Sequence, residues 1–166
     1  MDEQPNLREF INEVSNFTDE APASPAKGKG AAPGALGQVV EIAGSGSQIR
    51  IDAAALTALQ SHADASVAMS GQVGSQVKMM VGSNFLIANV RTLRSGDNGG
   101  LYAHVDYLGE GTMDSGGNLS NFRRGVTRYP IPGSEVFPVT TDDMRSIFAA
   151  SAEPHIETIP VDKAPA

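Results

Sequence analysis

The sequence has 166 residues, which is enough for one domain with a single hydrophobic core but tight for two full domains. Its 19 acidic and 12 basic residues leave a net charge of −7, which opposes non-specific attraction to DNA or to an anionic membrane. The sequence contains no cysteine, and this excludes disulfides, thiolate zinc sites, iron–sulfur centres and cysteine nucleophiles together.

The N-terminus lacks the features of an export signal. Met1 is followed by Asp2 and Glu3 rather than by a basic segment and an apolar core. No apolar run in the sequence approaches the ~18 residues of a membrane-spanning helix. We therefore predict a cytoplasmic protein that does not contact a membrane.

Residues 1–17 are predicted to form a short amphipathic helix. Apolar residues recur there at helical spacing, namely Leu7, Phe10, Ile11, Val14 and Phe17. Residues 18–36 are rich in Ala, Pro and Gly with few large apolar side chains, so they are predicted to form a flexible linker. A tethered helix of this kind is either a docking element for another subunit or protein, or a helix that packs on its own domain.

Residues 37–152 have the pattern of an antiparallel β-protein. Ile49 and Ile51 alternate with polar residues at the period of a strand, and residues 85–90 are apolar on both sides, which predicts a strand buried on two faces. Turn-forming clusters at 44–47, 95–100 and 114–120 separate such segments, and only 52–60 and 141–150 are predicted to be helical. We predict an all-β fold: a small closed or nearly closed antiparallel barrel of about six strands with one or two short helices.

Residues 122–148 combine several signals in a fixed order: a basic turn, a corner formed by prolines and Gly133, a short strand over 136–139 and a helix. Thr140 or Thr141 is predicted to cap that helix, and two aspartates follow in its first turn, where the helix dipole favours negative charge. The apolar residues predicted to share one face of the helix are Met144, Ile147 and Phe148.

Residues 122–148, together with 37–52, 76–94 and the LGEG motif at 108–111, resemble the HAS barrel, the N-terminal β-barrel of HerA-type hexameric ATPases that translocate DNA. The resemblance extends roughly from residue 37 to residue 160 and departs in the Ala-rich segment 52–65. It implies a non-catalytic barrel for assembly and partner docking within a homo-hexameric translocase or helicase. It also implies a nuclease or another protein as partner, and DNA held by the assembled ring rather than by the barrel directly.

The resemblance places the ATPase domain, with its ATP and Mg²⁺, after residues 153–166, which would connect to it. The chain itself has no Walker A motif, because the GKG at 28–30 lacks both the preceding glycine and the following Ser or Thr. His62, His104 and His155 have no metal-ligand spacing. We predict no catalytic residue, cofactor or metal here. Asp106 and Glu110 could face each other across a turn, but no pattern marks either carboxylate as desolvated.

Arg123, Arg124 and Arg128 lie beside Tyr129 and form the strongest candidate for an interface. They could contact another subunit or domain, bind nucleic acid, or pair with the domain's own carboxylates. A second hypothesis is a free-standing barrel of OB type that binds single-stranded nucleic acid or a protein partner. The sequence argues against single-stranded nucleic acid, because it has no Trp, six Phe, three Tyr and an acidic balance.

Overall fold

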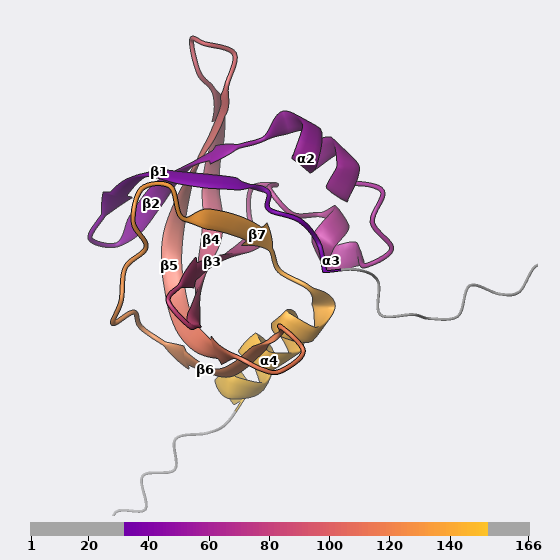
Figure 1. The fold of residues 1–166 in the computed structure, drawn as a ribbon, viewed down its shortest axis with the longest axis vertical. Helices are drawn as coiled ribbons and strands as arrows, with labels where there is room; N and C mark the ends of the chain where they lie inside the picture. The colour runs from indigo at the N-terminus through magenta and orange to yellow at the C-terminus, as the bar shows by residue number, and fades with distance from the viewer. Residues whose placement is uncertain (1–31, 153–166) are drawn as a thin grey trace, which may run out of the picture. The chain divides into compact units, whose positions relative to one another are not determined.

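The computed structural model describes residues 32–152 and confirms the predicted fold class: a mainly β-structure built on a closed antiparallel barrel (Figure 1). The predicted helix at 1–17 and the connector at 153–166 lie outside the described residues, as does all of the predicted linker except 32–36. The elements in chain order are β1 (Gly37–Ala43), β2 (Gly46–Ile51), α2 (Ala53–Leu59), α3 (Ala65–Ala68), β3 (Gln76–Val81), β4 (Asn84–Ser95), β5 (Leu101–Met113), β6 (Leu119–Arg124), β7 (Glu135–Pro138) and α4 (Thr141–Ala152).

Six strands close the barrel in the order β1, β2, β5, β4, β3 and β7, with β7 pairing back to β1. All of these pairings are antiparallel, and the consecutive strands β1–β2, β3–β4 and β4–β5 are joined by short turns. The seventh strand, β6, stands outside the closed ring and pairs with β5. Closure removes the open edges that a six-stranded sheet would otherwise expose.

The position of β6 follows from the length of β5, which has 13 residues. The first half of β5 pairs with β2 through Leu101–Asp106, and the second half pairs with β6 on the same edge. The two shorter strands therefore share one edge of β5, and β6 continues the sheet beyond the barrel. Helix α4 packs against β6, which places both at one side of the barrel (Figure 1).

Two hydrophobic clusters lie on the two faces of β4. Leu86, Ala88 and Val90 belong to the large cluster inside the barrel. Phe85 and Ile87 point the other way, into a smaller cluster with residues of β6 and α4. All five side chains are buried, so the predicted two-sided burial of residues 85–90 is confirmed. The smaller cluster is what attaches α4 to the outside of the barrel.

The helices begin at side-chain caps. Asp52 accepts hydrogen bonds from the first turn of α2, which lies within the predicted helix 52–60. Helix α3 has only four residues and was not predicted, although Asp64 caps it in the same way. At α4, Thr140 is the cap: its hydroxyl accepts from the Asp143 N–H, and the Asp143 carboxylate accepts from the Thr140 N–H.

Two local expectations need correction, one on Arg123 and Arg124 and one on Leu36. Arg123 and Arg124 lie in β6 rather than in a basic turn, because this segment pairs with β5 from Leu119 onward. Phe148 lines one groove with Met144 and Ile147, as predicted for a shared helix face, although 63% of Phe148 is exposed while Ile147 is buried. Leu36, in the last position of the predicted linker, is fully buried in the barrel core.

Within residues 32–152, no helix is both long and apolar enough to cross a membrane.

Candidate interaction surface

The candidate interface is organised around Glu110, a buried carboxylate on β5. It pairs with the guanidinium of Arg123 and accepts hydrogen bonds from the N–H of Thr127 at 3.0 Å and from its hydroxyl at 2.7 Å. The two hydrogen bonds from Thr127 contribute most to lowering the pKa of Glu110. Together with the hydrogen bond from Arg123, they outweigh the opposing effect of burial and lower this pKa to about 2. The expectation that Glu110 could face Asp106 across a turn is wrong, because both residues lie on the same strand, β5. The Glu110 carboxylate is also desolvated, which no pattern in the sequence indicated.

Two glycines allow β6 to lie close to Glu110. A Cβ at Gly109 would come within 2.2 Å of the Arg123 carbonyl oxygen, and one at Gly111 within 2.6 Å of the Ser120 carbonyl oxygen. Only glycine fits at such distances without moving the backbone. The LGEG motif therefore has a structural explanation: its glycines admit β6, and its glutamate holds the segment that follows β6.

A tyrosine pair anchors the far end of that segment. The rings of Tyr107 and Tyr129 lie 5.8 Å apart at a tilt of 54°, a favourable aromatic geometry. The Tyr107 hydroxyl also hydrogen-bonds to that of Ser47 on β2. Burial raises the pKa of Tyr107, and the hydrogen bond with Ser47 opposes this effect. Residues 123–129 are thus tied to β5 at both ends.

The three candidate arginines do not form a single cluster. Arg123 turns toward Glu110, whereas Arg124, its neighbour on the strand, lines a groove beside α4. Arg128 approaches Gly82 in the turn between β3 and β4. Within residues 32–152, neither Arg124 nor Arg128 forms an ion pair, and both are exposed. These two cations and the half-exposed Tyr129 are the groups that a partner could contact.

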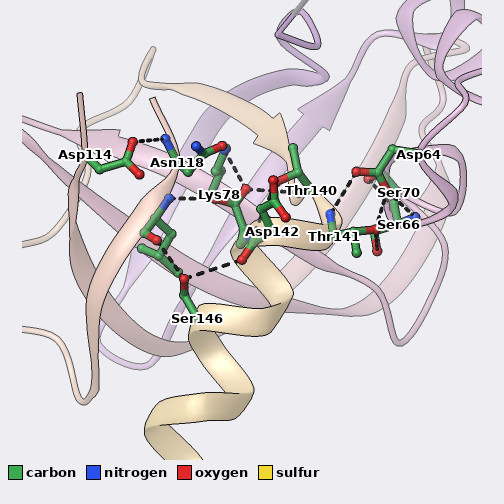
Figure 2. Close-up of polar contacts among 12 residues, drawn as sticks. Asp64, Ser66, Ser70, Lys78, Asp114, Asn118, Thr140, Thr141, Asp142 and Ser146 are labelled. Carbon is green, nitrogen blue, oxygen red and sulfur yellow. Dashed lines mark hydrogen bonds and ion pairs between the residues drawn. The ribbon is translucent and has the colours of Figure 1, made fainter. Parts of the chain in front are cut away.

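A second buried carboxylate, Asp143, lies at the start of α4 and was predicted only as first-turn charge. It is fully buried and accepts from the Lys78 ammonium at 2.7 Å, the Leu119 N–H at 2.7 Å and the Thr140 N–H at 3.0 Å. The Lys78 ammonium also lies 4.8 Å from the centre of the Phe85 ring. Figure 2 shows this network around Lys78 and Thr140, which joins β3, β6 and α4.

Asp64 forms a smaller network beside it (Figure 2). Its carboxylate accepts from the Ser66 N–H in α3 and from both the N–H and the hydroxyl of Thr141 in α4. Burial opposes ionisation of Asp64, but these hydrogen bonds outweigh it and lower the pKa of the carboxyl group. The N-cap residue of α3 is thereby hydrogen-bonded to the first residue of α4.

The remaining polar residues do not form a metal site within residues 32–152: no group of three or more His, Asp or Glu side chains there could hold an ion. His104 is exposed on β5, as predicted for a surface residue, and lines a groove with Asp106 and Arg91. The ion pair between Arg91 and Asp106 is also exposed. The absence of catalytic residues and cofactors stays a prediction.

The fold therefore places this chain among small antiparallel β-barrels with a helix packed on an outer strand. In comparisons with known proteins, no family model and no curated protein matches it. The resemblance to HAS barrels accordingly remains a prediction from the sequence.

Proposed function

We propose that this chain is the non-catalytic assembly and docking barrel of a HerA-like ring ATPase. Its work would be to hold copies of the protein in a ring and to position a partner or DNA. ATP and Mg²⁺ would act in a separate ATPase domain. The sequence motifs in residues 37–160 support the family, and the closed six-stranded barrel agrees with it.

One observation carries the assembly role: a segment with contacts to β5 at both ends presents two unpaired arginines. Arg124 and Arg128 have no ion-pair partner within residues 32–152, while the chain as a whole has a net charge of −7. Other copies of such an acidic chain offer carboxylates that these cations can bind. A contact between two different surfaces, repeated around an axis, closes into a ring. Fixing the segment in advance lowers the entropy cost of that contact.

Sedimentation velocity on the full 166-residue chain tests this proposal. Between about 10 μM and about 1 mM, the range for a contact of modest area, the wild-type chain should self-associate. Arg124→Glu and Arg128→Glu should each weaken association about tenfold, because charge reversal replaces attraction by repulsion. Their melting temperatures should not change, since both side chains are exposed.

Arg50→Glu is the matched control, because Arg50 is an exposed arginine on β2 with no ion pair within residues 32–152. It should associate like the wild-type chain. A wild-type chain that stays monomeric up to about 1 mM would contradict the assembly role. Equal weakening by all three charge reversals would show a general effect of net charge and would also contradict it.

A further inference from the structure

A pair of adjoining grooves runs along α4 on the outside of the barrel. One, of about 350 Å³, lies between α4 and the connection from α3 to β3, with Met69 and Val73 on its wall. The other, of about 200 Å³, lies between α4 and β6, with Arg124 and Phe148 on its wall. Gln76 and Met144 line both grooves, so the two adjoin at these side chains. We call the two together the α4 groove.

The walls of the α4 groove are apolar and exposed. Met69, Val73 and Phe148 are 58%, 63% and 63% exposed, respectively, and a local group of large apolar side chains in water commonly marks a binding surface. Met69 and Met144 contribute unbranched, adaptable side chains that fit the irregular apolar faces of partner helices. The side chains that hold α4 in place, Asp143 and Ile147, are buried beneath it. Phe148 is not needed for that attachment.

The charge on the groove distinguishes it from the rest of the chain. None of the residues that line either part is acidic, and Arg124 is the single charged residue among them. In a protein of net charge −7, the α4 groove therefore offers an acidic partner a cation and no lining carboxylate that would repel it. An apolar surface with one free guanidinium at its end selects a ligand that is apolar along one face and acidic at its edge.

We propose that the α4 groove binds an acidic amphipathic helix of a partner protein. Apolar side chains of that helix at positions i, i+4 and i+7 insert beside Met69, Met144 and Phe148, and a carboxylate pairs with Arg124. Helix α4 has 12 residues, or about 18 Å, so a partner helix of three to four turns spans the groove. This inference rests on the docking part of the proposed function and names the kind of partner.

The test uses two fluorescein-labelled helical peptides of about 14 residues, the length that matches α4. Both carry leucines at i, i+4 and i+7; one has glutamates on its polar face and the other has lysines. Fluorescence anisotropy with the full chain should show that the glutamate peptide binds at least about tenfold more tightly than the lysine peptide. Val73→Ser and Phe148→Ser should each weaken its binding about tenfold.

Ile131→Ser is the matched control, because Ile131 is 71% exposed and lines neither part of the groove. This variant should bind the glutamate peptide as the wild-type chain does. The groove variants should sediment like the wild-type chain, whereas Arg128→Glu should associate about tenfold more weakly but keep peptide binding. A failure of the peptide-binding proposal can therefore be distinguished from a failure of the assembly proposal.

Several results would overturn the inference. They are no binding of the glutamate peptide at about 1 mM, equal binding of the two peptides, or binding that Val73→Ser and Phe148→Ser leave unchanged. Competition by an oligo-dT strand, lost in Phe148→Ser, would assign the groove to single-stranded nucleic acid instead. Peptide binding that requires deletion of residues 1–31 would assign it to the chain's own N-terminal segment.

Discussion

Asp143 and Glu110 are both buried carboxylates, yet their surroundings differ. Asp143 is fully buried against a lysine that is itself buried, and its other bonds come from backbone N–H groups at the start of α4 and β6. Glu110 pairs with an arginine whose side chain is 65% exposed, and its other donors come from Thr127 in a surface segment. The first carboxylate ties elements of the core together, whereas the second ties the surface to the core.

Because of this difference, we expect the loss of Asp143 to affect mainly the stability of the fold and the loss of Glu110 to affect mainly residues 123–129. Removing Asp143 leaves the Lys78 ammonium buried without its partner, so its loss should strongly destabilise the fold. Removing the charge of Glu110 leaves an exposed arginine that water can solvate, so the barrel should persist while residues 123–129 loosen. A variant at Glu110 that folds but no longer holds residues 123–129 would support the proposed contact of this segment.

The largest expected effect is that of Asp143→Ala. It leaves the Lys78 ammonium and two backbone N–H groups without their acceptor, and breaking a buried pair in this way costs about 3 to 5 kcal/mol. Urea denaturation gives the free energy of unfolding. Asp142→Ala is the control, because the pair between Asp142 and Arg145 is exposed and should contribute less than about 1 kcal/mol. Equal losses in both variants would contradict the structural role of Asp143.

Glu110→Gln should have an intermediate effect. The amide keeps its shape and an acceptor for Thr127 but loses the charge, which should cost about 1 to 2 kcal/mol in the free energy of unfolding. The carboxyl pKa falls from its usual 4.5 to about 2 on folding, so the wild-type protein loses this stabilisation as pH drops from 4.5 toward 2. Between those pH values the wild-type curve should fall toward the Glu110→Gln curve. Parallel curves would disprove the linkage.

The smallest expected effect is that of Thr127→Val, which removes one hydroxyl donor and keeps the backbone N–H bond to Glu110. The loss should be about 0.5 to 1.5 kcal/mol, and the pKa of Glu110 measured by NMR should rise. Thr112→Val serves as the control, because the Thr112 hydroxyl bonds to Ser120 and Asn121 rather than to Glu110. An unchanged Glu110 pKa in Thr127→Val would show that the hydroxyl does not stabilise the carboxylate.

Patterns of local origin predicted much of the fold. Two-residue alternation and the turn clusters predicted the barrel, and the two-sided apolar segment 85–90 predicted a strand buried on both faces. The cap of α4 was also predicted, because a threonine before two aspartates is a local signal. Helix α3 was missed because its four residues give no periodic pattern, although Asp64 marks its start.

The candidate site was predictable only in part. Spacing in the sequence placed three arginines together, but strand alternation and the turn after β6 send them in three directions. The burial of Glu110 depends on β6, where its partner Arg123 lies 13 residues further along the chain, and no local pattern reveals this pairing. The glycines on either side of Glu110 were an available signal, since paired glycines in a strand indicate close approach of another backbone.

The most direct test of the account is sedimentation velocity of Glu110→Gln beside Asp142→Ala and the wild-type chain, at a concentration where the wild-type chain associates. We predict that Glu110→Gln remains folded by circular dichroism but associates more weakly, because residues 123–129 are no longer held for the contact. Asp142→Ala should associate normally. Unchanged association of a folded Glu110→Gln protein would show that this carboxylate does not prepare an interface, and would contradict the central claim.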